Sequence, residues 1–271
     1  TVVFLPTSRH RVALAAKHGE KPRVCAVIPA HNEEASIEAL ALSLAAQDYP
    51  ALHTVLCLDR CTDATAAKAR AILGPDPRFS ILEIDRCPED WAGKVNAVWQ
   101  GVGSEHARGA EILLFADADT VFDAACVSAT VALMQHRRLD LLSLLSTLTA
   151  RRWFELLVQP AAGLELVRQY PMLRANRRTG RRRAFANGQF MMFRREAYEA
   201  VGGHAGVKDE LLEDLALSRK IADAGRPAGL FFADGMLTCR MYESWEQFKS
   251  GWKRIYIESA KCKVGRLRQA S

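Results

Sequence analysis

The sequence contains no hydrophobic run long enough to cross a membrane. Its longest nearly uncharged apolar stretch, residues 141–150, is about half of the ~20 residues that a transmembrane helix requires. The sequence lacks the positively charged segment followed by an apolar one that marks a secretory signal. It begins with Thr1 rather than Met. We therefore expect no transmembrane helix in these 271 residues, and we expect any targeting information to lie upstream of them.

Paired cysteines and low-complexity segments are also lacking. The seven cysteines are odd in number, scattered and without CxxC spacing, which is typical of a protein kept in a reducing compartment. Neither an internal repeat nor a linker-like segment divides the chain. With 49% apolar and 25% charged residues, the composition is that of an ordered globular protein, and the length predicts one elaborated α/β domain.

The chain is basic, with a net charge of +6. A surplus of positive charge attracts anions, but nucleic acid, phospholipid headgroups and phosphorylated substrates satisfy it equally well. The basic residues form two local patches, one at residues 174–183 and one at residues 249–268. Aromatic residues interleave with the second patch, but no nucleic-acid-reading motif accompanies them, so we expect no nucleic-acid partner.

Strand-like and helix-like patterns alternate through residues 24–149. Apolar runs rich in β-branched residues predict buried strands, and apolar residues at helical spacing predict helices. Asn32 is placed to cap the first helix, and Thr62 or Asp63 the second. This alternation predicts right-handed βαβ units and a parallel sheet. The expected strands cover residues 24–28, 54–58, 79–84, 112–116 and 139–149, and the expected helices cover 33–47, 62–73, 94–101 and 123–136.

The remaining residues follow a different rhythm. A long apolar and basic helical stretch at 151–170 precedes the arginine-rich patch. A strand at 189–193 and helices near Glu196 and at 212–224 follow it. We interpret this part as a second subdomain packed on the first.

Polar side chains follow three of the predicted strands, in segments 29–33, 59–63 and 117–119. In open parallel sheets, ligands bind beyond the carboxyl ends of the strands. Asp117 and Asp119 stand at i and i+2 after a buried strand, where two carboxylates can approach one hard cation and leave positions for phosphate oxygens and water. The pattern indicates Mg or Mn bridging a diphosphate.

Each of these residues also has a purely structural explanation. Asp117 and Asp119 can form a turn and a helix cap, because Asp is common in both. Asp59 can be a turn acid, Asn32 a helix cap and Lys94 a solvated lysine at a helix start.

Glu213 and Asp214 form a second acidic site, at the start of an amphipathic helix. Acids there favour the helix dipole, which is the structural explanation. The functional one is a general base, because displacement at a sugar's anomeric carbon by a hydroxyl needs a carboxylate to accept the proton. Either acid would serve.

Taken in order, these segments resemble a family 2 glycosyltransferase with the nucleotide-diphospho-sugar transferase (GT-A) fold. Two positions depart from the family pattern: Leu58 stands where many relatives have the first of two Asp, and Cys61 where they have Ser, so base contacts can differ. The resemblance runs from about residue 24 to residue 254 and rests on Val27 to Glu33, Asp59 with Thr62 to Thr65, Gly93–Lys94 with Ala97, Asp117 to Asp119, Asn187–Gly188, Val201 to Gly203 and Glu213–Asp214.

Two further segments narrow the resemblance. Residues 247–252 do not fit the Gln-x-x-Arg-Trp signature of processive polysaccharide synthases, which favours transfer of a single sugar. Residues 91–94 and 242–244 are most similar to hopanoid-associated and to lipid or carotenoid glycosyltransferases, whose longer chains carry membrane helices outside this region.

The resemblance implies an α/β protein of GT-A type, with a Rossmann-like, mostly parallel sheet flanked by helices and an acceptor-side subdomain. Residues 1–22 would be an N-terminal extension, 23–150 the nucleotide-sugar-binding half, and 151–271 the acceptor-side half. The implied reaction is an inverting transfer from a nucleoside diphosphate-sugar, with UDP-sugar favoured, to a hydroxyl acceptor, a lipid or another alcohol, assisted by Mg or Mn.

The resemblance also assigns roles to residues of this sequence. Pro29, Asn32, Glu33 and Asp59 would surround the base and ribose, with Lys94 near the same pocket. Asp117 and Asp119 would hold the metal and the sugar side of the donor. The carboxylate of Asp214 or Glu213 would be the catalytic group and act as the general base. The expected donor-binding residues are Pro29, Ala30, Asn32, Glu33, Asp59, Lys94, Asp117, Ala118, Asn187, Gly188 and Arg254.

The second half offers surfaces for a membrane. The stretch 151–170 is either an interfacial helix or a buried helix that caps the sheet, and the arginines of 174–183 either attract anionic headgroups or phosphate or form a solvated loop. The aromatic and basic residues near the C-terminus predict a surface helix with an apolar inner stripe, on which Arg254 can face the diphosphate. We expect the protein at the cytoplasmic face of a cell membrane.

Two rival functions share some of these sequence features. A sugar nucleotidyltransferase shares the nucleotide-binding sheet and the paired acids, but it should carry a glycine- and base-rich phosphate loop after the first strand, unlike residues 29–32. A catalytically inactive, membrane-associated scaffold is the other rival, and the intact acids Asp117, Asp119 and Asp214 argue against it.

Overall fold

A computed structural model describes residues 21–148, 152–158, 160, 164, 176, 185–240 and 244–259, with side chains up to residue 253. Most of the expected N-terminal extension, the arginines of 174–183, the larger part of the expected helix 151–170 and the side chain of Arg254 lie outside the described residues. Within the part that is described, none of the helices combines the length and apolar character needed to cross a bilayer.

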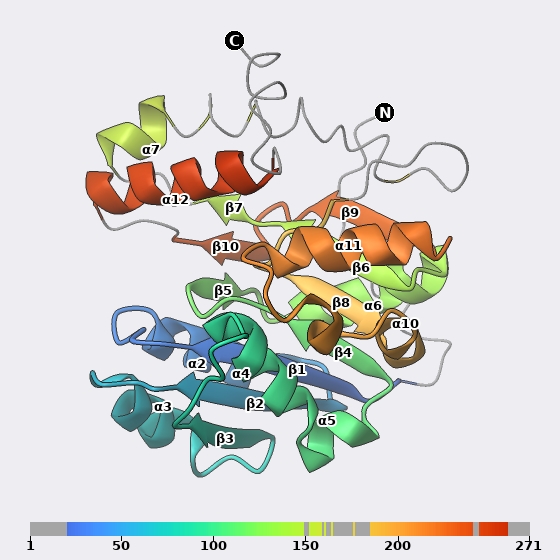
Figure 1. The fold of residues 1–271 in the computed structure, drawn as a ribbon. Helices are drawn as coiled ribbons and strands as arrows, with labels where there is room; N and C mark the ends of the chain where they lie inside the picture. Colours follow the sequence, from blue (N-terminus) through green and yellow to red (C-terminus); the bar gives the residue numbers. More distant parts are fainter. Residues whose placement is uncertain are drawn as a thin grey trace.

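The fold is built on a seven-stranded sheet with the strand order β3-β2-β1-β4-β8-β6-β9 (Figure 1). Its strands are β1 (Val24–Ala30), β2 (Leu52–Asp59), β3 (Phe79–Ile84), β4 (Ile112–Phe115), β6 (Leu141–Leu145), β8 (Met191–Arg194) and β9 (Ala228–Phe232). All pairs are parallel except those of β8, which runs antiparallel to both β4 and β6. The expected mostly parallel sheet is confirmed.

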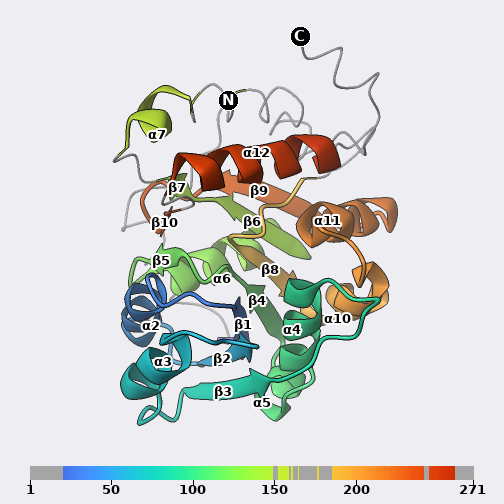
Figure 2. The same ribbon diagram turned by 60° about the vertical axis from the view of Figure 1, so that its left-hand side comes forward.

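Helices cover both faces of this sheet, which explains why its strands read as continuous apolar runs (Figure 2). One face packs on α2 (Ile37–Ala45), α3 (Thr65–Leu73) and α6 (Cys126–Arg137), and the other on α4 (Gly93–Val102), α5 (Glu105–Gly109), α10 (Arg195–Ala200) and α11 (Glu213–Asp223). Alternate residues of β1 enter the two cores: Ala26 and Ile28 face the first, Cys25 and Val27 the second.

A second, three-stranded sheet has the order β5-β10-β7, with β5 (Thr120–Phe122), β10 (Leu237–Cys239) and β7 (Thr147–Leu148). The strand expected over 139–149 is therefore two strands in different sheets. The last helix, α12 (Trp245–Ser259), lies over the small sheet with α7 (Trp153–Leu157) beside it, at the top of Figure 1. The buried Phe248 and Trp252 form the expected apolar inner stripe of α12.

Several expected boundaries shift because the strand-to-helix connections are longer than the pattern indicates. The first helix begins at Ile37 after the N-cap Ser36, so Asn32 is not its cap. Asn32 instead adopts a left-handed conformation with φ 54°. The second helix begins at Thr65, and its first N–H donates to the Asp63 carboxylate at 3.0 Å.

The sheet joins the two parts of the chain that the sequence separates near residue 150. Strand β8, from the later part, lies between β4 and β6.

Helix α4 packs closely on the sheet at Gly101. A Cβ on Gly101 would lie 2.5 Å from both Cys57 Sγ and Val27 Cγ1. Glycine at this position lets α4 approach β1 and β2, which places its first residues beside the strand ends.

Candidate active site

The carboxyl ends of β1, β2 and β4 meet at one edge of the sheet because the three strands are parallel. A cavity of about 370 Å³ opens there. It is lined by Pro29, Ala30, His31, Glu33, Asp59, Arg60, Gly93, Lys94, Ala97, Asp117, Ala118 and Asp119. Seven of the expected donor-binding residues therefore share one cavity, together with the expected metal ligand Asp119.

Asn32 does not line the cavity. Its side chain is exposed, and its Oδ1 accepts hydrogen bonds from the Thr62 backbone N–H (2.8 Å) and hydroxyl (3.3 Å). Asn32 thus ties the turn after β1 to the turn after β2. Its expected contact with the donor stays a prediction.

Asp119 is a partly buried acid with one buried and unused oxygen. Within the described residues, its Oδ1 has no hydrogen-bond partner. Burial and, next, the charge of Asp117 raise the pKa of Asp119 to about 7, while a hydrogen bond with the Cys239 thiol acts in the opposite direction. A carboxylate in this position gains from a cation brought by a ligand.

The fit of a metal ion can be judged from these donors. Among the described residues, no group of three or more His, Cys, Asp or Glu side chains is arranged to hold a metal. Mg²⁺, however, is commonly held by one or two carboxylates together with substrate phosphates and water. Asp117 and the unused oxygen of Asp119 fit that type of site.

Lys94 connects the two acidic segments. Its Nζ lies 2.7 Å from Asp117 Oδ1 and 2.7 Å from Glu213 Oε1. Burial disfavours its charge, but the Asp117 and Glu213 charges outweigh burial and hold the Lys94 pKa well above its usual value. Lys94 lines the cavity with Pro29 and Asp59, near the pocket that the resemblance implied, and its ammonium lies between Asp117 and the start of α11.

Asp214 lies partly buried at the start of α11. Its Oδ2 accepts from the Gly188 N–H (2.8 Å) and its Oδ1 from the Leu215 N–H (2.7 Å). Burial and, next, the charge of Glu213 raise the pKa of Asp214 to about 7, although Lys94 and the two N–H groups act in the opposite direction. A carboxylate with this pKa is suited to accept a proton near neutral pH.

Gly188 brings these groups together. A Cβ at this residue would lie 3.1 Å from Lys94 Nζ and 3.3 Å from Asp214 Oδ2. Asn187, its neighbour, is held by Ser143, whose hydroxyl accepts from the Asn187 N–H at 2.8 Å. The acids that the sequence spreads over about a hundred residues thus surround a single lysine and a single glycine.

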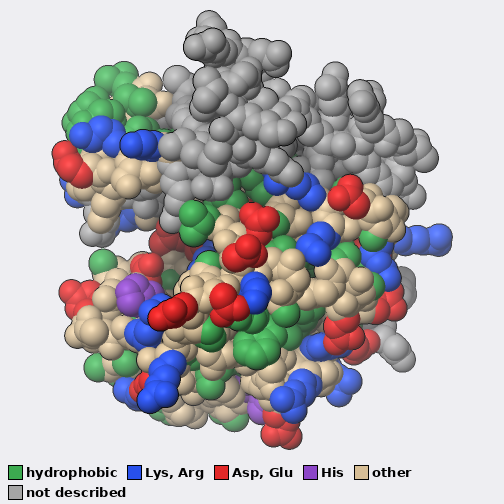
Figure 3. Space-filling view, in the orientation of Figure 1, with side chains coloured by type: hydrophobic (Ala, Val, Ile, Leu, Met, Phe, Trp, Pro, Cys, Tyr) green, Lys and Arg blue, Asp and Glu red, His purple; other side chains and the backbone are tan. Residues whose placement is uncertain are grey.

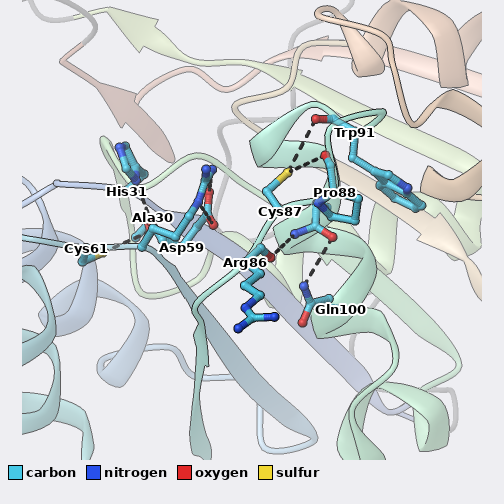
Figure 4. A network of polar contacts seen from close by, with 11 residues as sticks. Ala30, His31, Asp59, Cys61, Arg86, Cys87, Pro88, Trp91 and Gln100 are labelled. Carbon is cyan, nitrogen blue, oxygen red and sulfur yellow. Dashed lines mark hydrogen bonds and ion pairs between the residues drawn. The ribbon is translucent and has the colours of Figure 1, made fainter.

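Four residues that the sequence analysis did not select belong to this region. Arg60 and His31 line the cavity, and His31 Nδ1 lies 2.6 Å from the Asp59 carbonyl oxygen (Figure 4). Gln189 donates to Cys239 Sγ at 3.1 Å, beside Asp119. For Arg60 a signal was present, because a basic residue follows the strand-end acid directly; Gln189 and Cys239 lie in strand-like segments with no such signal.

Comparisons with known proteins show the family of this chain. A family model described as "Glycosyltransferase like family 2" matches residues 22–255. The 4,4'-diaponeurosporenoate glycosyltransferase of Staphylococcus aureus (strain MRSA252) is 27% identical over 257 residues, which cover 91% of this chain and 64% of that protein. The chain therefore spans less than two thirds of that relative's length.

Solved structures show the same fold. The mannosyltransferase PcManGT from Pyrobaculum calidifontis, in complex with GDP-Man and Mn²⁺, matches with a TM-score of 0.59 and 18% identity over 87% of this chain and 64% of that one. The glucosyl-3-phosphoglycerate synthase of Mycobacterium tuberculosis, in complex with Mn²⁺, UDP and glucosyl-3-phosphoglycerate, matches with a TM-score of 0.58 and 18% identity over 91% and 81%. At this identity the likeness concerns the fold, and the expected GT-A type is confirmed.

Proposed function

The chain belongs to the family 2-like glycosyltransferases, and from this premise we propose that it transfers a single sugar from a nucleoside diphosphate-sugar to a hydroxyl acceptor, with inversion at the anomeric carbon. The observation that carries the proposal is the shared cavity at the strand ends. There, donor-side acids and a candidate base on a different element contact the same lysine. An inverting transfer needs both groups at one reaction centre, the acids at the diphosphate of the donor and the base at the hydroxyl of the acceptor.

The residues of this chain divide the work as follows. The β1 and β2 ends, with Pro29 and Asp59, hold the base and ribose. Asp117 and Asp119 hold the diphosphate side of the donor. Asp214 accepts the proton of the acceptor hydroxyl, and its two backbone hydrogen bonds keep the carboxylate oriented as the proton arrives.

Lys94 links the two steps in this proposal. In the absence of a donor, its ammonium neutralises Asp117 and Glu213. A diphosphate beside Asp117 competes for the same ammonium, which would then offer its donors to the leaving group. Mg²⁺ or Mn²⁺, held by Asp117 and Asp119, would supply positive charge for the departing diphosphate. Mn²⁺ accompanies the donor nucleotide in two of the solved relatives.

We propose a lipid as the acceptor, in agreement with the carotenoid-type substrate in the name of the staphylococcal relative. An exposed apolar surface supports this assignment. On α7, Trp153 is 58% exposed, Leu156 58% and Leu157 73%. Hydrophobic side chains gather over α7 beside Lys and Arg side chains in Figure 3. A Trp- and Leu-bearing face next to basic residues suits the interface between headgroups and acyl chains.

The same helix is anchored to the body of the protein. Its Phe154 is buried, and the Trp153 and Phe154 rings lie 5.1 Å and 5.7 Å from the Trp245 ring of α12. The exposed face is therefore held in a fixed direction, as a membrane-binding surface requires. We place the protein at the cytoplasmic face of a membrane, which agrees with the free state of the six cysteines that the structure describes.

Neither rival gains support from the site. A nucleotidyltransferase should use a glycine-rich loop and a helix N-terminus for phosphate. Residues 31–36, between β1 and α2, contain no glycine, and α2 begins only at Ile37. An inactive scaffold would not need the raised pKa of Asp214. Mn²⁺-dependent hydrolysis of a nucleotide-sugar by the purified protein would separate the transferase from the scaffold.

A thermal-shift screen tests the proposal directly. UDP-, GDP- and other nucleotide-sugars are added with and without Mn²⁺, and a ligand that binds only the folded state stabilises it by about 2.7 kcal/mol at a concentration of 100 times its Kd. We expect Asp119→Ala to abolish the Mn²⁺-dependent part of the shift. If no nucleotide-sugar raises the Tm of the wild type at any Mn²⁺ concentration, the donor class is wrong.

A further inference from the structure

The Asp59 carboxylate at the end of β2 is already bound on both oxygens. Arg60 Nε donates to Oδ1 and Arg60 Nη2 to Oδ2, each at 2.8 Å, in a bidentate pair. The Asp59 side chain is only 5% exposed, whereas that of Arg60 is 44% exposed. Both residues line the cavity, and the guanidinium is the more exposed group of the pair.

The backbone holds Arg60 in this position. It has a left-handed conformation with φ 50°, and its N–H donates to the Ile84 carbonyl oxygen at 2.9 Å. Gly93 packs directly on the pair, since a Cβ on this residue would lie 2.8 Å from Arg60 Nη2 and 3.3 Å from Asp59 Oδ2. The pair thus fits against the first turn of α4, where Gly93 leaves the necessary space.

The chemistry of this pair differs from that of a lone carboxylate. A carboxylate accepts hydrogen bonds from ring N–H and amino groups, whereas a guanidinium only donates. Two N–H groups of Arg60 are used by Asp59, and the others have no hydrogen-bond acceptor among the residues that the structure describes. They are available to carbonyl oxygens and ring nitrogens of a ligand in the cavity.

We propose that the Asp59–Arg60 pair reads the nucleobase of the donor through the guanidinium, and that it selects a base with a carbonyl on its outer edge, uracil or guanine, over adenine. The inference rests on the proposed function, since it concerns the donor of that reaction. Arg commonly donates to guanine O6 and N7, and uracil presents O2 or O4 to the same donors. Adenine carries an amino group at this edge, which is itself a hydrogen-bond donor and would face the N–H groups of the guanidinium without offering them an acceptor.

A base is a better ligand for this pair than a phosphate. Asp59 cancels the charge of Arg60, so the pair as a whole offers little attraction to a dianion. Lys94 and the metal position at Asp117 and Asp119 provide the positive charge that a diphosphate needs. The geometry therefore assigns the neutral end of the donor to the β2 edge of the cavity.

Isothermal titration of the full chain with UDP, GDP and ADP, each with Mn²⁺, tests this inference. The variants are Arg60→Met, which removes the donors, and Arg60→Lys, which keeps the charge but loses the bidentate fork. Arg86→Met is the matched control, because Arg86 is exposed and points away from Asp59 in Figure 4. Circular dichroism establishes that each variant is folded.

We expect the wild type and Arg86→Met to bind UDP or GDP about tenfold or more tightly than ADP. Arg60→Met should lose this preference by weakening UDP or GDP far more than ADP, and Arg60→Lys should lose most of it. An equal loss for all nucleotides would place Arg60 on the phosphate, and an unchanged preference would show that Arg60 does not read the base; either result overturns the inference.

The test separates this inference from the proposed function. If the wild type binds no nucleoside diphosphate with Mn²⁺, the proposed donor class fails and the inference fails with it. If Arg60→Met does not fold because Asp59 is left unpaired, Gly93→Ala replaces it, since the added methyl displaces the end of the Arg60 side chain. A folded Gly93→Ala that keeps the full preference for UDP or GDP would then overturn the inference alone.

Discussion

Asp214→Asn removes the proposed base while changing the shape of the site very little. Asn keeps one oxygen, so it can accept from Gly188 or from Leu215 but not from both, as Asp214 does. General-base catalysis contributes roughly 10²- to 10⁴-fold to a rate, and we expect kcat to fall by that factor. Binding of the donor nucleotide should change less than about twofold, because Asp214 contacts the acceptor side in this proposal.

The pH dependence of the wild type gives the second measurement. Burial and the Glu213 charge raise the pKa of Asp214 to about 7, and the base acts in its ionised form. The rate should therefore rise as pH increases through 7 and level off above it, with about a tenfold gain between pH 6 and pH 8. In Asp214→Asn this rise should be absent at saturating Mn²⁺, which keeps Asp119, whose pKa is also raised to about 7, ionised at each pH.

The contribution of Asp214 to the free energy of unfolding changes with pH in the opposite direction to the rate. The folded pKa of Asp214 lies above its unfolded value of about 3.9, so between these values the folded state binds more protons than the unfolded state. Through this group, the free energy of unfolding of the wild type decreases as pH rises from about 4 through 7. The Tm of Asp214→Asn relative to the wild type should accordingly be higher at pH 8 than at pH 5.

The assay is the Mn²⁺-dependent release of nucleoside diphosphate from a nucleotide-sugar, with water as the acceptor. Asp209→Asn is the matched control, because Asp209 is an exposed acid five residues earlier in the chain and no described contact ties it to the site. A normal rate in Asp214→Asn, or a rise of the rate with pH that survives in this variant at saturating Mn²⁺, would refute the assignment of the base. In that case Glu213 would be examined next.

Two further predictions concern the lysine bridge and the exposed helix. Lys94→Met leaves Asp117 and Glu213 without their shared cation. Because the lysine is 40% exposed, we expect a loss of about 1–2 kcal/mol in the free energy of unfolding, measured with urea at pH 8, where the lysine of the wild type is charged; an unchanged free energy of unfolding would contradict the bridge. Trp153→Ser combined with Leu157→Ser should lower binding to anionic phospholipid vesicles more than tenfold in a sedimentation assay. Leu42→Ser on α2 is the exposed apolar control. Unchanged sedimentation of the double variant would show that α7 is not part of the membrane-binding surface.

The order of the elements was accessible from the sequence. The strand over 24–28, its parallel neighbours over 54–58 and 79–84 and the strand over 112–116 are all found within a few residues of the expected limits. Their apolar runs and the intervening helical spacing are local properties, and such patterns persist in the folded chain when both sheet faces are covered. The boundaries were less accurate, as at Asn32, because turn geometry depends on partners such as Thr62 in another loop.

The strand over 189–193 illustrates the limit of local patterns. Its residues predict a strand, and β8 is found at Met191–Arg194. Nothing in its spacing indicates that it inserts antiparallel between β4 and β6, since pairing partners are chosen by the packing of the whole sheet. This insertion brings Asn187 and Gly188 to the acids, so the placement of those two residues depends on tertiary structure.

The sequence by itself determined which polar residues stand at the ends of the strands, because that follows from their covalent order after each apolar run. Only the tertiary structure decided which of their charges neutralise one another. Lys94 bridges Asp117 and Glu213, Arg60 covers Asp59, and Cys239 reaches Asp119 from a strand 120 residues later. Such pairings depend on distances of a few ångströms between separate elements, and the elements reach those distances only when both cores are packed.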